Sequence, residues 1–194
     1  MITRQQIVGA FSARVRPEAE QLLRLNVGAD GEKLRRLLAS KSSMELSTHD
    51  VNSVVEGNLW LLEPTAFRYY LPAFLAVVVE SYSTVSVFAS ELVGALTEPT
   101  RSDVDDALSR VAQAPAGAGL PDDGRQLLQR QQREWFASGT PSAVFAERVA
   151  GLTPAEGATL LSFFDDLAGA HGADFPFDEL ELAVGRHWAR YRKG

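Results

Sequence analysis

Cysteine is absent from this chain of 194 residues. Without cysteine the protein can form neither disulfide bonds nor metal sites built from thiolates. A chain of this length does not need such cross-links, because it can bury enough apolar surface for a stable core. The composition is compatible with a reducing compartment, and we expect the protein to be cytoplasmic.

Excess positive charge and long hydrophobic runs are also missing. The net charge of -6 argues against a nucleic-acid partner, because phosphate contacts need a basic surface. The longest apolar run covers residues 71–79, whereas about 20 residues are needed to cross a bilayer. The first residues, from Met1 to Gln6, are polar and lack a signal-peptide pattern. We therefore expect neither a nucleic-acid nor a membrane partner.

A single apolar stripe dominates the middle of the sequence. Its members recur at the spacing of one helix face and are Phe67, Tyr70, Leu71, Phe74, Leu75, Val78 and Tyr82. Pro64 suits the first helical position, where its missing N–H is not needed. Pro72 lies inside the run, and its ring and missing N–H predict that the helix kinks or restarts at Leu71 and Pro72. Residues 71–79 are apolar on every side, which predicts a central buried helix.

Helix start signals recur along the rest of the chain. Thr3 and Thr153 each form a capping box with the residue three positions later, and Ser102 with Asp105 is expected to open a further helix. No strand pair or hairpin signal stands out. We predict an all-α fold, a compact bundle of about eight to ten short helices around the central kinked helix.

A low-complexity stretch at 112–121 predicts a loop. We expect one helical domain over 1–194, which could divide into lobes 1–111 and 122–194 joined by this loop. A polar helix should follow the loop from Asp122 or Asp123, with a thin apolar face formed by Leu127, Leu128 and Trp135.

The block from Trp60 to Leu75 reads Trp-Leu-Leu-Glu-Pro-Thr-Ala-Phe-Arg-Tyr-Tyr-Leu-Pro-Ala-Phe-Leu. Later, Leu152-Thr153-Pro154-Ala155-Glu156-Gly157 leads into another helix. The order of these two motifs resembles that in a family of small bacterial proteins of unknown function. Its members pair a Phe-x-Tyr-Tyr-Leu-Pro-Ala helix with a later Leu-Thr-x-x-Glu/Gln helix. The resemblance implies no catalytic residue. Such proteins look like those found beside contact-dependent and secreted toxin systems, where small acidic proteins often serve as immunity partners.

No motif in the sequence indicates catalysis. His49 and Asp50 could begin a metal-hydrolase site, but no histidine precedes them, and His171 and His187 lie far along the chain. There is neither a Gly-x-Ser-x-Gly elbow nor a phosphate-binding loop. We therefore expect no metal and no cofactor, and the sequence favours a non-catalytic protein over an enzyme.

Two groups of side chains are candidates for binding. Asp103, Asp105 and Asp106 cluster in one first helical turn, where they either complement the helix dipole or form an acidic face. Arg68 and Tyr69 lie beside the apolar stripe, and both residue types are favoured interface anchors. We expect a protein–protein interaction module, and immunity to a basic toxin domain is its most concrete version.

Two alternatives stay open at this point. The first is a small hydrolase with a carboxylate-lined pocket, which would require at least two carboxylates to converge. The second is a homo-oligomeric scaffold, with Trp135 and Phe136 or the polar helix at a subunit contact. The sequence leaves the oligomeric state undecided.

Overall fold

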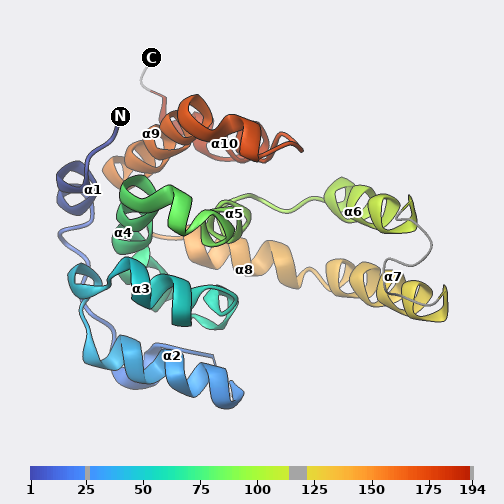
Figure 1. The fold of residues 1–194 in the computed structure, drawn as a ribbon, viewed down its shortest axis with the longest axis horizontal. Coiled ribbons are helices and arrows are strands. Elements are labelled where there is room, and N and C mark those ends of the chain that lie inside the picture. The colour runs from blue at the N-terminus through green and yellow to red at the C-terminus, as the bar shows by residue number, and fades with distance from the viewer. Residues whose placement is uncertain (25–26, 114–121, 193–194) are drawn as a thin grey trace. The chain divides into compact units, whose positions relative to one another are not determined.

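The structure is a computed structural model that describes residues 1–24, 27–113 and 122–192, and its regular elements are helical (Figure 1). The α-helices in these ranges are α1 Arg4–Ala10, α2 Gly28–Ser40, α3 Thr48–Asp50, α4 Pro64–Ser81, α5 Ser86–Ala95, α6 Arg101–Gln113, α7 Asp122–Ala137, α8 Thr140–Val149, α9 Pro154–His171 and α10 Glu179–Arg186. The prediction of an all-α protein with eight to ten helices is confirmed.

Short helical turns connect these elements. They are the 3-10 turns η1 Ala19–Gln21, η2 Ser43–Glu45, η4 Leu59–Leu61, η5 Tyr82–Thr84, η6 Gly172–Asp174 and η7 Trp188–Tyr191, and the π-helical turn η3 Val51–Val55. Within the described ranges the β-type pairing is one isolated antiparallel bridge, between Leu23 and Leu62. None of the helices described is both long enough and apolar enough to cross a bilayer.

The described chain divides into two compact units. We call residues 1–97 and 148–194 the main unit and residues 98–147 the hairpin unit. The hairpin unit contains α6, α7 and most of α8, whose last residues, Arg148 and Val149, belong to the main unit. The predicted loop at 112–121 lies mostly outside the described residues, and the division into lobes 1–111 and 122–194 stays a prediction.

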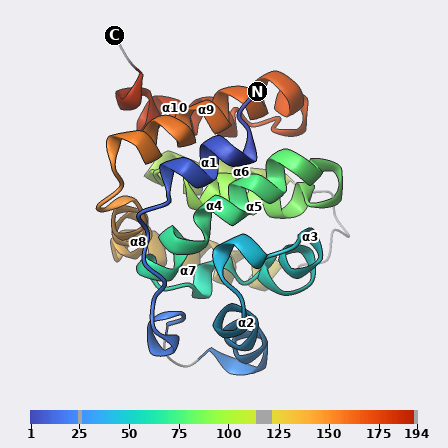
Figure 2. The same ribbon diagram turned by 90° about the vertical axis from the view of Figure 1, so that its left-hand side faces the viewer.

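Helix α4 forms the centre of the main unit. It contacts α1, α5 and α9, and Figure 2 shows α1 running beside both α4 and α9. All residues from 71 to 78 are buried, which confirms the predicted central helix. Phe67, Tyr70 and Phe74 are fully buried, so the aromatic stripe belongs to the core.

Pro72 does not end this helix. The helix α4 continues from Pro64 to Ser81, so the restart predicted at Leu71 and Pro72 is wrong, and a kink within one helix is the alternative that remains. An internal proline costs about 3 kcal/mol, whereas burying one large apolar side chain contributes about 1.5–3 kcal/mol. Because α4 buries a continuous run of such side chains, packing outweighs the lost backbone hydrogen bond.

Local signals explain two of the helix starts. The Thr3 hydroxyl accepts a hydrogen bond from the Gln6 N–H at 3.3 Å, and the Thr153 hydroxyl accepts one from the Glu156 N–H at 3.2 Å. In return, both Gln6 and Glu156 accept a hydrogen bond from the backbone N–H of the capping residue. Both predicted capping boxes are confirmed.

The start of α6 differs from the prediction. This helix begins at Arg101, and the Thr100 N–H donates to the Asp103 carboxylate at 2.7 Å. The predicted start at Ser102 with Asp105 is therefore wrong by two residues. Thr100 with Asp103 and Ser102 with Asp105 have the same three-residue spacing, so the pattern alone did not distinguish them.

Two buried aromatic residues bind the ends of other helices. The Tyr70 hydroxyl lies 2.6 Å from the Leu38 carbonyl oxygen and 2.9 Å from that of Lys41, at the end of α2. The Trp188 indole N–H donates to the Leu96 carbonyl at 2.8 Å, at the end of α5. These contacts satisfy carbonyl groups that a helix leaves unpaired at its C-terminus. They also allow a Tyr and a Trp to be fully buried.

Candidate protein-binding surface

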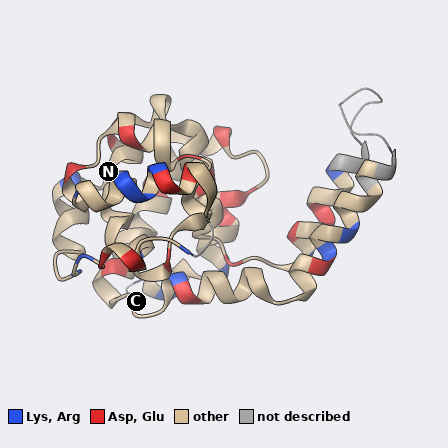
Figure 3. Ribbon diagram, turned by 90° about the horizontal axis from the view of Figure 1, so that it is seen from below, with Lys and Arg blue, Asp and Glu red and all other residues tan. Residues whose placement is uncertain are grey.

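The predicted acidic residues lie on α6 in the hairpin unit. The Asp105 carboxylate is 3.8 Å from Arg101 on the same helix and 3.9 Å from Arg133 on α7. Asp103 caps the helix through Thr100, and Asp106 is exposed. Asp103 therefore has a local capping role, and Asp105 links α6 to α7 through Arg133. Figure 3 shows acidic and basic residues mixed along the helices of the hairpin unit.

Large apolar side chains are exposed on α7. Leu127 keeps 54 % of its surface exposed and Trp135 keeps 52 %. These residues are eight positions apart, about two helical turns, so they lie on the same side of the helix. We call this side of α7, with Leu127 and Trp135, the α7 face.

In the hairpin unit, few of the side chains that the structure describes are buried. Among its described residues the buried apolar side chains include Leu108 and Phe145. A solitary exposed leucine is ordinary on a protein surface, but a half-exposed tryptophan beside it is a residue type enriched at binding hot spots. Trp135 therefore gives the α7 face one residue of the type that is enriched at the centre of interfaces.

Arg68 and Tyr69 lie in the main unit and are both half-buried. The Tyr69 ring packs edge-on against Tyr70, with 4.9 Å between the ring centroids. Burial lowers the pKa of Arg68, the nearby charge of Arg14 lowers it further, and Glu156 opposes both effects. These two residues and the three aspartates belong to different units, so neither unit contains both predicted groups.

Beside Arg68 lies an ion pair that the sequence did not predict. The Arg14 guanidinium donates two hydrogen bonds of 2.6 Å to the two oxygens of the Glu156 carboxylate. Burial alone would raise the pKa of Glu156, but the hydrogen bonds from Arg14 and Thr153 outweigh burial and lower it. This pair joins the segment after α1 to the start of α9, which identifies it as a structural contact.

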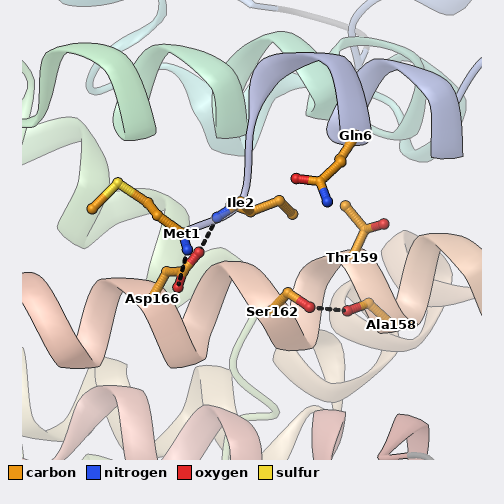
Figure 4. A pocket seen from close by; sticks show the side chains of 7 residues that line it. All are labelled: Met1, Ile2, Gln6, Ala158, Thr159, Ser162 and Asp166. Carbon is orange, nitrogen blue, oxygen red and sulfur yellow. Dashed lines mark hydrogen bonds and ion pairs between the residues drawn. The ribbon is translucent and has the colours of Figure 1, made fainter.

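A polar cavity of about 380 Å³ lies between the chain start and α9 (Figure 4). Its lining includes Met1, Gln6, Thr159 and Asp166. The Met1 amino group pairs with Asp166 at 3.6 Å, and the Ile2 N–H also donates to this carboxylate. Asp166 is the one carboxylate among the described residues of this lining, and acid–base hydrolysis would require a second.

His49 is exposed, whereas Asp50 has a structural role. The Asp50 carboxylate accepts hydrogen bonds from Lys41 at 2.6 Å and from the Ser47 hydroxyl at 2.6 Å. A further hydrogen bond, accepted from the Ser47 backbone N–H at 2.8 Å, closes the capping box at the start of α3. Among the residues that the structure describes, no three His, Asp or Glu side chains are grouped as a metal ion would require.

Comparisons with family models, with curated proteins and with solved structures gave no match for this chain. The resemblance carried by the Trp60–Leu75 block therefore stays an expectation, and the candidate surface depends on its geometry alone. The sequence predicted a thin apolar face that includes Leu127 and Trp135, and it offered Trp135 with Phe136 as a subunit contact. The amphipathic pattern indicated which residues are apolar, but not that these two remain uncovered.

Proposed function

We propose that this protein is a non-catalytic protein–protein interaction module and that the α7 face of the hairpin unit contacts its partner. The observation that carries this proposal is the pair of half-exposed apolar side chains, Leu127 and Trp135, on a unit in which few of the described side chains are buried. Burial of a tryptophan at the centre of an interface often contributes 2 kcal/mol or more to binding, roughly a 30-fold change in affinity.

Charge indicates the kind of partner. Residues 98–147 contain eight acidic and five basic side chains, so the hairpin unit is net negative. A partner with a basic rim around an apolar pocket would fit both properties and would associate quickly through electrostatic attraction. A basic toxin domain meets this description, which makes immunity to a toxin the concrete version of the proposal. The proposed setting is the cytoplasm, as expected from the cysteine-free composition.

The test uses the product of the neighbouring open reading frame as the partner. This product is co-expressed with the full chain, and both complex formation and relief of toxicity are measured. We expect Trp135→Ala and Leu127→Ala each to weaken the complex about 10-fold or more, because each removes an apolar anchor. Both side chains are half-exposed, so the folded chain should remain almost as stable as the parent.

Trp60→Ala is the matched control. Trp60 is 62 % exposed, like Trp135 a surface tryptophan, but it lies in the main unit. The proposal requires that this substitution leave binding unchanged. Equal binding by the Trp135, Leu127 and Trp60 variants would exclude the α7 face, and failure of the parent chain to bind or to relieve toxicity would exclude the immunity version.

A further inference from the structure

A second cavity, of about 540 Å³, lies in the main unit and plays no part in the proposed protein contact. Its walls come from η5, the start of α5, the end of α9 and η6. A volume of this size falls in the range of small-molecule sites, roughly 300–1,000 Å³. The lining residues decide which class of molecule would suit it.

One wall is a cluster of three side chains. The rings of Tyr82 and His171 stack with 3.6 Å between their centroids and an angle of 12° between their planes. The Asp174 carboxylate lies 3.8 Å from Nδ1 of His171. Burial raises the pKa of Tyr82 to about 12, and a hydrogen bond to Asp174 and the charge of Asp174 raise it as well. The carboxylate is therefore anchored beside an aromatic pair.

The other lining residues supply hydroxyl groups and one apolar side chain. Ser83 and Ser86 have exposed hydroxyls with no hydrogen-bond partner among the described residues. Ser90 donates to the Ser86 carbonyl at 3.2 Å. Val87 lines the same cavity and is 66 % exposed. A ligand here would meet hydrogen-bonding groups and a small apolar surface together.

The electrostatics of this cavity favour a cation. Of the described residues that line it, none is Lys or Arg, and Asp174 is the one carboxylate. The helices α4 and α9, each of 18 residues, end at Ser81 and His171 beside the cavity, and a helix C-terminus carries partial negative charge. The N-terminus of the shorter helix α5 carries partial positive charge, which opposes the negative charge of the two C-termini. A carboxylate with two helix C-termini would repel an anion and attract a positive group.

We propose that this cavity binds a small organic ammonium ion. The Asp174 carboxylate would accept hydrogen bonds from the ammonium group, Ser83 and Ser86 would supply further acceptors, and the Tyr82–His171 pair would face the cation. The alkyl part of the ligand would lie against Val87. Aromatic rings attract such cations through the negative charge on their faces, and charge-assisted hydrogen bonds are about twice as strong as neutral ones.

Putrescine is the probe for this proposal, and 1,4-butanediol is its neutral counterpart. Titration of the full chain is followed by calorimetry and by NMR shifts of backbone amides. We expect saturable putrescine binding with a Kd on the order of 1 mM or below, because exposed ion pairs are individually weak. The shifted amides should lie around 82–87 and 171–174, and butanediol should bind at least about 10-fold more weakly.

Variants distinguish putrescine binding at this cavity from nonspecific attraction of a cation to an acidic protein. Asp174→Asn should weaken putrescine binding about 10-fold or more. Asp165→Asn is the matched control, because Asp165 is similarly exposed on α9 but pairs with Arg192 and does not line the cavity. Ser86→Ala leaves the aromatic cluster intact and should weaken binding about 2–5-fold.

Four results would overturn the proposal. They are no saturable binding of putrescine, equal binding of butanediol, equal losses in the two aspartate variants, and shifts spread over the acidic surface. Thermal unfolding of each variant confirms that it is folded. This cavity lies in the main unit and the α7 face in the hairpin unit, so a negative result here does not affect the proposal for the α7 face. For the same reason, Trp135→Ala should not change putrescine binding.

Discussion

The Phe74 side chain is fully buried in the aromatic part of the core. Its ring meets Phe88 edge-on at 5.5 Å and lies 6.4 Å from Tyr70. Replacing it with alanine should lower the free energy of unfolding by about 3–5 kcal/mol, because the substitution removes buried apolar surface and leaves a cavity. Urea denaturation measures this loss.

Val87→Ala is the comparison for Phe74→Ala. Val87 is 66 % exposed, so its truncation should change the free energy of unfolding by no more than about 0.5 kcal/mol. Similar small losses at both positions would contradict the central place of α4.

Glu156 should make stability depend on pH. Its pKa is lowered in the folded protein, so the stabilisation is fully present above the unfolded value, near 4.5, and is lost as the pH falls through the lower folded value. Glu156→Gln should cost about 1.5–3 kcal/mol at pH 7, the usual contribution of hydrogen bonds to a charged group.

The measurement for Glu156 is urea denaturation of the parent chain and the Gln variant from pH 7 to pH 3. The difference between the two should shrink below about pH 4.5, because the parent carboxyl then becomes protonated. A difference that stays constant over this range would contradict the role assigned to the Arg14 pair.

Among the elements, α9 offers two glycines with opposite expectations. A Cβ atom at Gly157 would meet the Tyr191 ring at 2.3–2.5 Å, whereas one at Gly169 would meet nothing within 4 Å. Gly157→Ala should therefore cost about 1–3 kcal/mol through overpacking against η7. Gly169→Ala should stabilise the protein by about 0.5–1 kcal/mol, because glycine is a poor residue in a helix interior.

Thermal unfolding of the two glycine variants provides the test. The melting temperature should fall for Gly157→Ala and rise for Gly169→Ala. A rise at both positions would show that η7 does not pack on α9 as described, since the helical preference for alanine alone would then explain both changes.

Sequence patterns predicted the elements best where the deciding contacts are local. The capping boxes at Thr3 and Thr153 span three residues, and the buried face of α4 follows from the helical period alone. The continuation of α4 through Pro72 was not predictable in this way, because burial by other elements outweighs the local penalty. The start of α6 was not predictable from local sequence either, because Thr100 with Asp103 and Ser102 with Asp105 are equivalent capping patterns.

Several contacts that sequence patterns did not predict join distant parts of the chain. Arg14 pairs with Glu156 across 142 positions, and Tyr82 of η5 stacks on His171 at the end of α9. Nothing in either local sequence indicates its partner. The aspartates of α6 were recognisable as a cluster, but only the structure assigns Asp103 to a cap and Asp105 to ion pairs.

Across the whole molecule, the two units should differ in local stability. The main unit buries the aromatic and aliphatic side chains around α4, whereas few described side chains of the hairpin unit are buried. Native-state hydrogen exchange should therefore be faster in α6 and α7 than in α4 and α9, because opening the hairpin unit exposes less apolar surface. Equal protection in the two units would contradict the division described above.

The central claim is that the α7 face contacts a protein partner, and site-specific photo-crosslinking tests it most directly. A photoreactive amino acid is placed at Gln131, which is exposed on α7 between Leu127 and Trp135, or at Ser53, which is exposed in the main unit. With the neighbouring gene product co-expressed, we predict one discrete adduct at position 131 that is lost on Trp135→Ala, and none at position 53. No adduct at 131, or equal adducts at both positions, would contradict the proposed surface.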